Sequence, residues 1–493
     1  MTVPMAPEQS LNELLGTVSR RNRDIVPSHV SGGDVLIRSI TQHSGTVESG
    51  SLFCAIPGTT NDGHNFVEDA VARGAAAVLV ERPSTTEVPE VIVSDSRLAV
   101  GHLAAAFAGN PTDEVRLVGV TGTNGKTSIV TLLAHIVNSS GGVAASTGTL
   151  TGSLTTAAAP EFQVALQRYR EAGTDVVAAE ISSHALDQAR VAGSEIAVAV
   201  FSNLSQDHLD YHHTMEEYFA AKAKLFSNEF AADVVIDVSD PWGRRLMDDL
   251  RSDDPDSDRK FVEVDGAALT AAATLRQTSS SFEWRGIRID LPIGGAFSIT
   301  NAVLAAEVAA LLGFDQHRIA EALANAPQIP GRFESIDAGQ PFAVIVDYSH
   351  TPASVAAAIE SARELAENRV VIVFGAAGDR DAGKRPLMGA AATAADVLFV
   401  TSDNPRTEDP ERIIDDVVAG VETASRTPTT VNRVSDRAQA IVSAISGALP
   451  GDVVVIAGKG HEDYQIIGTT RSDFDDRVHA RAALASLGWE SAT

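Results

Sequence analysis

A glycine-rich turn that carries a lysine and a threonine is the clearest chemical pattern in this sequence. It reads GTNGKT at 122–127, between an apolar run at 115–121 and a helix predicted over 127–138. Glycines let backbone N–H groups approach phosphate oxygens closely, and the helix N-terminus adds its positive dipole end. Lys126 could contact terminal phosphates, and the Thr127 hydroxyl is a suitable Mg²⁺ ligand.

The turn departs from the full phosphate-loop pattern, because Val120 stands at the first glycine position. The alternative is an ordinary strand–helix turn whose lysine is solvated. The buried strand before the turn and the helix after it favour a nucleotide site. The predicted contacts are Gly122, Thr123, Asn124, Gly125, Lys126, Thr127 and Ser128.

Acids and a histidine follow two further predicted strands. Glu180 ends the strand predicted over 175–180, and the strand over 196–201 runs into SNLSQDHLDYH, which contains Asp207 and His208. Ligands of open α/β sheets bind at the carboxyl ends of the strands. Mg²⁺ prefers oxygen ligands, so a histidine would be an unusual ligand in a second site. The alternative is loop polarity or helix capping.

A predicted helix over EEYFAAKAKLF carries Lys222 and Lys224. Lysines on helices are ordinarily solvated. The residue pattern gives no reason to choose either one as a functional group.

Three polar segments follow predicted strands in the last third of the chain: GDRDAGKRP, SDNPRTEDP and AGKGHEDYQ. Arg406 suits bidentate capture of a carboxylate. Asp403, Asn404 and Glu462 could hold an ammonium group, so together the segments predict a site for a zwitterion such as an amino acid. The alternative is a set of turns with solvated charges. Further cations in the first segment are Arg380, Lys384 and Arg385.

Length, composition and charge limit the class of protein that positions these groups. The chain has 493 residues and a net charge of −27, which argues against binding to nucleic acid or to an anionic membrane. A single cysteine, Cys54, excludes an internal disulfide. Neither a signal peptide nor a membrane-spanning apolar stretch is recognisable, and we expect a cytoplasmic protein.

Two seams, at 109–114 and 325–333, predict three domains over 1–111, 112–330 and 331–493. Strands alternating with helices predict the α/β class, with two open sheets. The central strands are expected at 115–121, 175–180, 196–201 and 234–238, and short antiparallel strands at 261–293. The last domain repeats the alternation, with strands at 343–347, 370–374, 397–401 and 453–457.

Nine segments in order carry a family resemblance: GTNGKTS, AEISSHALDQARV, SNLSQDHLDYH, YFAAKAKLF, PGRFE, VDYSHTP, FGAAGDRDAGKRPLMG, TSDNPR and AGKGHEDYQ. From about residue 38 to its end, the chain resembles the Mur ligase family, of the MurE type. It departs from the family pattern at His43-Ser44-Gly45, where Asp-Ser-Arg is usual.

The resemblance implies an N-terminal domain for the UDP part of the substrate, a central phosphate-loop ATPase and a C-terminal Rossmann-like domain. It implies that ATP phosphorylates the D-glutamyl carboxylate of UDP-N-acetylmuramoyl-L-Ala-D-Glu, and that an amino acid amine then displaces phosphate. The DNPR turn at 403–406 is similar to the version that adds meso-2,6-diaminopimelate rather than L-lysine.

The resemblance also implies a role for each matching residue. Lys126, Glu180, His208 and Lys222 would be catalytic, and Thr127, Glu180, His208 and a carboxylated Lys222 would hold Mg²⁺. ATP would also contact Asn301, Arg332, Asp347 and His350. The UDP-muramoyl dipeptide would contact Ser44, Thr59, Thr60, Asn61, Thr155, Thr156, Ser182, Gln188 and Arg190. Diaminopimelate would contact Arg380, Asp403, Asn404, Pro405, Arg406, Gly458 and Glu462.

Three other hypotheses about the function stay open. They are a Mur ligase that adds L-lysine, a ligase like folylpolyglutamate synthetase, and a nucleotide-binding protein without turnover.

The expected partners are the UDP-muramoyl dipeptide, diaminopimelate and ATP, with no nucleic acid or membrane, and we expect a monomer.

Overall fold

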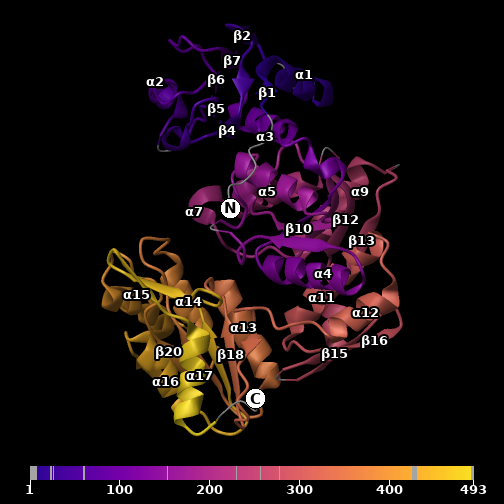
Figure 1. The fold of residues 1–493 in the computed structure, drawn as a ribbon. Helices are drawn as coiled ribbons and strands as arrows, with labels where there is room; N and C mark the ends of the chain where they lie inside the picture. Colours follow the sequence, from indigo (N-terminus) through magenta and orange to yellow (C-terminus); the bar gives the residue numbers. More distant parts are fainter. Residues whose placement is uncertain are drawn as a thin grey trace.

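The computed structural model describes residues 8–489, except for 23, 24, 26, 59, 60, 153, 229, 256, 277 and 425–429. Thr59 and Thr60, which were predicted to contact substrate, therefore lie outside the described residues. The described chain forms three successive α/β bodies, coloured from indigo to purple, from magenta to salmon, and from orange to yellow in Figure 1. Among the described residues, no helix is both long and apolar enough to cross a membrane.

The first body is built on a five-stranded sheet in the order β2-β7-β6-β5-β4, in which only β2 is antiparallel to its neighbour. Its strands are β2 (His29–Ser31), β4 (Ser39–Thr41), β5 (Ser51–Cys54), β6 (Ala77–Val80) and β7 (Glu90–Ile92). The helices are α1 (Leu11–Arg21), α2 (Val67–Ala72) and α3 (Ser96–Phe107), and β1 (Gln9–Ser10) pairs with β3 (Leu36–Ile37).

The central body holds a six-stranded, fully parallel sheet in the order β13-β12-β11-β8-β10-β9. Its strands are β8 (Arg116–Thr121), β9 (Ala144–Thr147), β10 (Val176–Glu180), β11 (Ile196–Phe201), β12 (Ala231–Asp237) and β13 (Phe261–Val264). The inner strands are apolar runs because helices cover both faces of the sheet.

The helices of this body are α4 (Lys126–Ser139), α5 (Ala159–Glu171), α6 (Ser183–Asp187), α7 (Leu209–His212), α8 (Met215–Ala223), α9 (Pro241–Asp253), α10 (Gly266–Ala271), α11 (Ala296–Leu311) and α12 (Gln316–Ala324). A small antiparallel sheet accompanies them, with β14 (Thr274–Leu275), β15 (Ser280–Trp284) and β16 (Ile287–Leu291).

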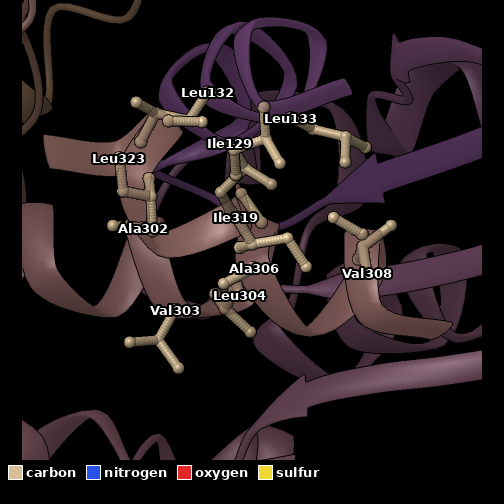
Figure 2. Close-up of a cluster of buried hydrophobic side chains, with 14 of the residues drawn as sticks. Ile129, Leu132, Leu133, Ala302, Val303, Leu304, Ala306, Val308, Ile319 and Leu323 are labelled. Carbon is tan, nitrogen blue, oxygen red and sulfur yellow. The ribbon is translucent and has the colours of Figure 1, made fainter. Parts of the chain in front are cut away.

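A buried apolar cluster fixes α4, the helix that follows the phosphate loop. Figure 2 shows Ile129 and Leu133 of α4 beside Ala302 of α11 and Ile319 of α12. These side chains are fully buried. Burial of a large aliphatic side chain contributes roughly 1.5–3 kcal/mol, so this packing holds the loop that precedes α4 in place.

The C-terminal body has a six-stranded sheet in the order β17-β18-β22-β19-β20-β21, parallel except for β17. Its strands are β17 (Glu334–Ser335), β18 (Ala343–Asp347), β19 (Val370–Phe374), β20 (Val397–Val400), β21 (Thr430–Arg433) and β22 (Val453–Ala457). The helices are α13 (Pro352–Leu365), α14 (Lys384–Ala392), α15 (Pro410–Thr423), α16 (Arg437–Ser446) and α17 (Asp476–Ser486), and β23 (Tyr464–Ile467) pairs with β24 (Thr470–Asp473).

The predicted α/β class is confirmed, but the first body adds a third, mostly parallel sheet to the two that were predicted, because its short strands gave only a weak signal in the sequence. The prediction of antiparallel strands throughout 261–293 is wrong in its first part, because β13 pairs in parallel with β12 and extends the central sheet. Only β14, β15 and β16 are antiparallel. A short segment such as FVEV does not indicate in its own sequence which strand it will pair with.

Candidate functional site

The glycine-rich turn joins β8 to α4 and can be formed only with glycine at two positions. Gly122 and Gly125 have φ of 143° and 88°, in the region that glycine adopts without strain. A Cβ at Gly122 would collide with the Ser202 hydroxyl, and one at Gly125 would collide with the Asn301 side chain. The end of β11 holds the turn, since the Thr123 N–H donates to the Asn203 carbonyl at 2.9 Å.

Lys126 folds over this turn. Its Nζ donates to the carbonyl oxygens of Gly122 and Thr123, both at 2.9 Å. Burial lowers the pKa of Lys126, while the charges of Glu180 and Asp207 oppose that shift. The ammonium therefore lies where the phosphates of a nucleotide in the turn would be in reach.

Glu180 lies at the carboxyl end of β10, the strand beside β8, and its position pairs with Val120. Its side chain is only 2% exposed. The two carboxylate oxygens accept hydrogen bonds from the Thr149 N–H at 2.9 Å and the Thr149 hydroxyl at 3.0 Å. Its charge opposes the lowering of the Lys126 pKa, and its predicted role as a Mg²⁺ ligand stays a prediction.

His208 follows β11 and lies beside Asp207. Its φ of 55° is unusual for a residue other than glycine. Its Nε2 is 3.5 Å from Asp207 Oδ2, and its ring is edge-on to that of His184 at 4.9 Å. Burial lowers the pKa of His208 to about 4, against the opposing charge of Asp207. A neutral imidazole is the form that can act as a ligand.

The two lysines of the α8 segment occupy different environments. Lys222 is 1% exposed, donates to the Gly122 carbonyl at 2.9 Å and lies 4.6 Å from the centre of the Tyr218 ring. Burial, together with the charge of Lys126, lowers the pKa of Lys222 well below its usual range. Lys224 instead forms a surface ion pair with Asp187 at 3.1 Å.

A cavity of about 450 Å³ lies between the central and C-terminal bodies. Residues 123–128 of the phosphate turn form one wall, and 347–350 of the C-terminal body form the other. A cavity of this size accommodates a small-molecule ligand. The predicted site residues that line it are Thr123, Asn124, Gly125, Lys126, Thr127, Ser128, Thr155, Glu180, His208, Asn301, Arg332, Asp347 and His350.

Arg332 connects the two walls of this cavity. Its Nη2 donates to the Thr127 hydroxyl at 3.1 Å, and its guanidinium lies 4.3 Å from the centre of the Tyr348 ring. Burial lowers the pKa of Arg332, and Asp347 opposes that shift. The contact places a cation of the C-terminal body directly at the phosphate turn.

Asp347 and His350 are held by local hydrogen bonds where β18 ends. Asp347 accepts from the Phe333 N–H at 2.8 Å and from the Ser349 N–H at 2.9 Å. His350 Nδ1 lies 2.8 Å from the Tyr348 carbonyl oxygen, and burial lowers the pKa of the imidazole.

Four of the nine residues predicted for the muramoyl dipeptide form a network next to Glu180. The Thr156 hydroxyl donates to the Glu180 carbonyl at 2.8 Å and accepts from the Ser182 N–H at 3.0 Å. Arg190 donates to the Thr156 carbonyl at 2.8 Å and to Gln188 Oε1 at 2.7 Å. The network therefore adjoins the end of β10.

Ser44 and Asn61 lie in the first body and do not line the cavity. Ser44 is half-buried in a short 3₁₀ turn, and Asn61 is exposed, with its carbonyl accepting from the Gly58 N–H at 3.0 Å. Their predicted role on the uridine side stays a prediction.

The residues predicted to bind the amino acid substrate lie in the DNPR turn and the GKGHED loop, and these two segments come together in the C-terminal body. Asn404 Nδ2 donates to Glu462 Oε2 at 3.0 Å, and Asp403 and Asn404 are both buried. Arg406, with φ of 52°, donates to the Gly378 carbonyl at 3.0 Å. Gly458 leaves no room for a side chain, since a Cβ there would lie 2.7 Å from Asp403 Oδ2.

The first polar segment of this body contributes less than the sequence predicted. Arg385 is 2% exposed and forms ion pairs with Glu408 at 2.7 Å and Asp416 at 3.0 Å. It therefore joins α14 to α15 and is not a free cation for a ligand. Arg380 is exposed, and Pro405 is buried in the turn.

Sequence reasoning missed three side chains of this region. Thr149 holds Glu180, Tyr348 lies against Arg332, and Lys459 lies between Asn404 and Glu462. Tyr348 and Lys459 stand inside VDYSHTP and AGKGHEDYQ, so the motifs indicated the right segments but not these residues.

Three family models match successive parts of the chain. They describe a "Mur ligase family, catalytic domain" at residues 36–111, a "Mur ligase middle domain" at 120–309 and a "Mur ligase, glutamate ligase domain" at 331–460. A protein of Geobacillus kaustophilus, named UDP-N-acetylmuramoyl-L-alanyl-D-glutamate--2,6-diaminopimelate ligase, is 42% identical over 93% of this chain and 96% of its own length.

Solved structures agree with these matches. A structure of a UDP-N-acetylmuramoyl-L-alanyl-D-glutamate--2,6-diaminopimelate ligase has a TM-score of 0.65 and 33% identity, covering 92% of this chain and 96% of its own. The MurF ligase of Thermotoga maritima, solved in complex with ADP, shares the fold at 19% identity and a TM-score of 0.57, over 85% of this chain and 93% of its own. The chain belongs to the Mur ligase family.

Proposed function

We propose that this chain is an ATP-dependent ligase that joins meso-2,6-diaminopimelate to the D-glutamyl carboxylate of UDP-N-acetylmuramoyl-L-Ala-D-Glu in peptidoglycan precursor synthesis. The 42% identical relative named for this reaction, matched along almost its whole length, carries the proposal. The arrangement of Asp403, Asn404, Arg406 and Glu462 supports it, because these groups together suit an ammonium and a carboxylate.

The phosphate turn and the residues around it support the first half of the reaction. The D-glutamyl carboxylate would attack the γ-phosphorus of ATP, giving an acyl phosphate and ADP. Negative charge moves among the phosphoryl oxygens during such a transfer, and fixed cations stabilise it. Lys126 and Arg332 are the cations placed at the turn, and Asn301 borders it.

The donor set suits Mg²⁺, which prefers oxygen ligands. The Thr127 hydroxyl and the Glu180 carboxylate both line the cavity. The described residues contain no group of three or more His, Cys, Asp or Glu side chains that could hold a metal. The family resemblance implies that Thr127, Glu180, His208 and a carboxylated Lys222 would be the protein ligands. When bound, Mg²⁺ neutralises charge on the transferring phosphoryl group.

The environment of Lys222 supports its carboxylation. Its depressed pKa favours the neutral amine, and among the described residues no acid forms an ion pair with it. The neutral amine would attack carbon dioxide, form an N–C bond and release one proton, giving a carbamate. This change turns a cation into an oxygen ligand beside the phosphate turn.

The C-terminal loops would hold the incoming amino acid for the second half of the reaction. A neutral amine of diaminopimelate attacks the acyl carbon, and the tetrahedral intermediate collapses to the amide and inorganic phosphate. Arg406 would bind the carboxylate at the far end of the molecule, while Asp403 and Glu462 would bind its ammonium. The binding of that end orients the reacting amine.

We also propose that the protein works in the cytoplasm and as a monomer. ATP and nucleotide-linked sugars are cytoplasmic metabolites, and residues of a single chain line both walls of the cavity. Sedimentation of the purified protein at assay concentration tests the monomer; a dimer at that concentration would contradict it.

Phosphate release from ATP tests the proposed function. The purified protein is incubated with Mg²⁺ and the UDP-muramoyl dipeptide, with either meso-diaminopimelate or L-lysine. We expect release with diaminopimelate and little with lysine. Phosphate release with L-lysine alone would still show a ligase of this type, but it would reject diaminopimelate as the amino acid substrate. Release only with a folate substrate and glutamate would favour the folylpolyglutamate-type ligase, and ATP binding without turnover would favour a binding protein.

A further inference from the structure

Lys459 is a fully buried lysine in the loop after β22, and none of the roles above uses it. Its side chain is 0% exposed. Its Nζ lies 3.1 Å from Glu462 Oε2, 3.2 Å from Asn404 Oδ1 and 3.8 Å from Asp403 Oδ1. It therefore touches the side chains that the proposed function assigns to diaminopimelate.

Burial of an ammonium group is costly, and its ion pairs often only offset that cost. An apolar side chain of similar length would fill the same space without the desolvation penalty. Fold stability alone therefore gives no reason for a charged residue here, and a role in the site is the better explanation.

Lys459 fixes the orientation of Asn404. The Asn404 Oδ1 accepts from both Lys459 Nζ and the Ile466 N–H, the latter at 3.0 Å. With its oxygen held by two donors, the amide must direct Nδ2 toward Glu462, to which it donates at 3.0 Å. The lysine thereby joins the DNPR turn to the GKGHED loop.

Lys459 also sets the charge of this cluster. Asp403 and Glu462 contribute two negative charges, and Lys459 and Arg406 contribute two positive charges. The nearby Arg437 is already neutralised by Asp476, at 2.7 Å. The charges of these four side chains therefore sum to zero, which matches a ligand end that carries one ammonium and one carboxylate. Without Lys459 the sum would be −1, which favours an end that is a bare ammonium.

We propose that Lys459 is a positioning residue that makes the amino-acid site select a diamino acid with a zwitterionic far end over one whose far end is only an ammonium. The inference rests on the proposed function, and it adds a determinant of selectivity that does not itself need to touch the substrate.

The test compares Lys459→Met with the wild-type enzyme. The measured quantity is kcat/KM for diaminopimelate divided by kcat/KM for L-lysine, with KM for ATP measured in parallel. Loss of a hydrogen-bonded charge predicts that this ratio falls by about 10- to 100-fold. KM for ATP should stay within about twofold, because Lys459 contacts no residue of the phosphate turn.

Two further variants separate charge from packing. Lys459→Arg keeps the charge and should keep most of the selectivity even if KM rises. Lys260→Met removes an exposed lysine that lies 3.9 Å from Asp233 in the central body, and it should change nothing. Thermal melting and ATP binding establish that each variant is folded. If Lys459→Met does not fold, Lys459→Gln, which keeps a donor without the charge, takes its place.

A folded Lys459→Met or Lys459→Gln enzyme with the wild-type ratio would overturn the inference. Equal losses for both amino acids, with the ratio unchanged, would also overturn it and leave Lys459 a structural residue. A wild-type enzyme without diaminopimelate-dependent phosphate release would instead refute the proposed function itself, so the two failures are distinguishable.

Discussion

The buried ion pair between Arg437 and Asp476 should be the most sensitive point of the C-terminal body. Both side chains are buried, and two hydrogen bonds of 2.7 Å join them. Arg437 also donates to the carbonyl oxygens of Ser402 and Ala457, at 3.4 and 2.9 Å. These residues directly precede Asp403 and Gly458, so one arginine supports both amino-acid loops.

Asp476→Ala leaves the guanidinium without its acid in a site closed to water. Removal of one partner from a buried pair costs about 3–5 kcal/mol of folding free energy. The exposed pair of Arg433 and Asp415 in the same body gives the control, since exposed pairs contribute about 0–1 kcal/mol. Asp415→Ala should therefore have little effect.

Urea denaturation followed by circular dichroism, together with calorimetry, measures both variants. We expect the transition of the C-terminal body to move to lower urea in Asp476→Ala only, and KM for diaminopimelate to rise in the folded variant. If the free energy of unfolding falls by less than about 1 kcal/mol in both variants, the Arg437–Asp476 pair does not support the amino-acid loops as we describe.

Three further predictions concern the site and the first body. Lys222→Ala should lower turnover by at least about 100-fold, with partial rescue by short carboxylic acids, whereas Lys224→Ala should stay near wild type; equal losses would reject the assignment of Lys222. Arg406→Ala should raise KM for diaminopimelate about 10-fold or more while leaving that for ATP unchanged, and an equal rise in both would contradict its role. Cys54 is buried, and burial raises the pKa of its thiol, so thiol reagents should label it only on unfolding. Fast labelling of the native protein, measured by mass spectrometry, would show that the core of the first body opens.

The strands that form the site could be predicted because their signal is local. An apolar run bounded by polar residues identifies a buried strand such as β11, whose observed bounds, Ile196–Phe201, equal the predicted ones. Pairing is not local, which is why antiparallel pairing was wrongly predicted for the segment that forms β13. The motif segments were recognisable for the same reason as the strands, since each is short and contiguous.

The environments of single side chains could not be predicted in the same way. Lys222 and Lys224 look alike in sequence, and only the fold places one at the Gly122 carbonyl and the other at Asp187. In the sequence, Arg385 has the features of a ligand-binding cation. In the structure it instead forms ion pairs with Glu408 and Asp416, which lie on other segments. Contacts between residues far apart in the chain decide such roles.

The formation of product from diaminopimelate tests the central claim most directly. The wild-type protein is incubated with ATP, Mg²⁺, the UDP-muramoyl dipeptide and an equimolar mixture of meso-diaminopimelate and L-lysine, and the nucleotide products are separated by mass. We predict the diaminopimelate tripeptide as the main product, with ADP and phosphate formed in equal amounts. A lysine tripeptide as the main product, or no tripeptide at all, would contradict the account.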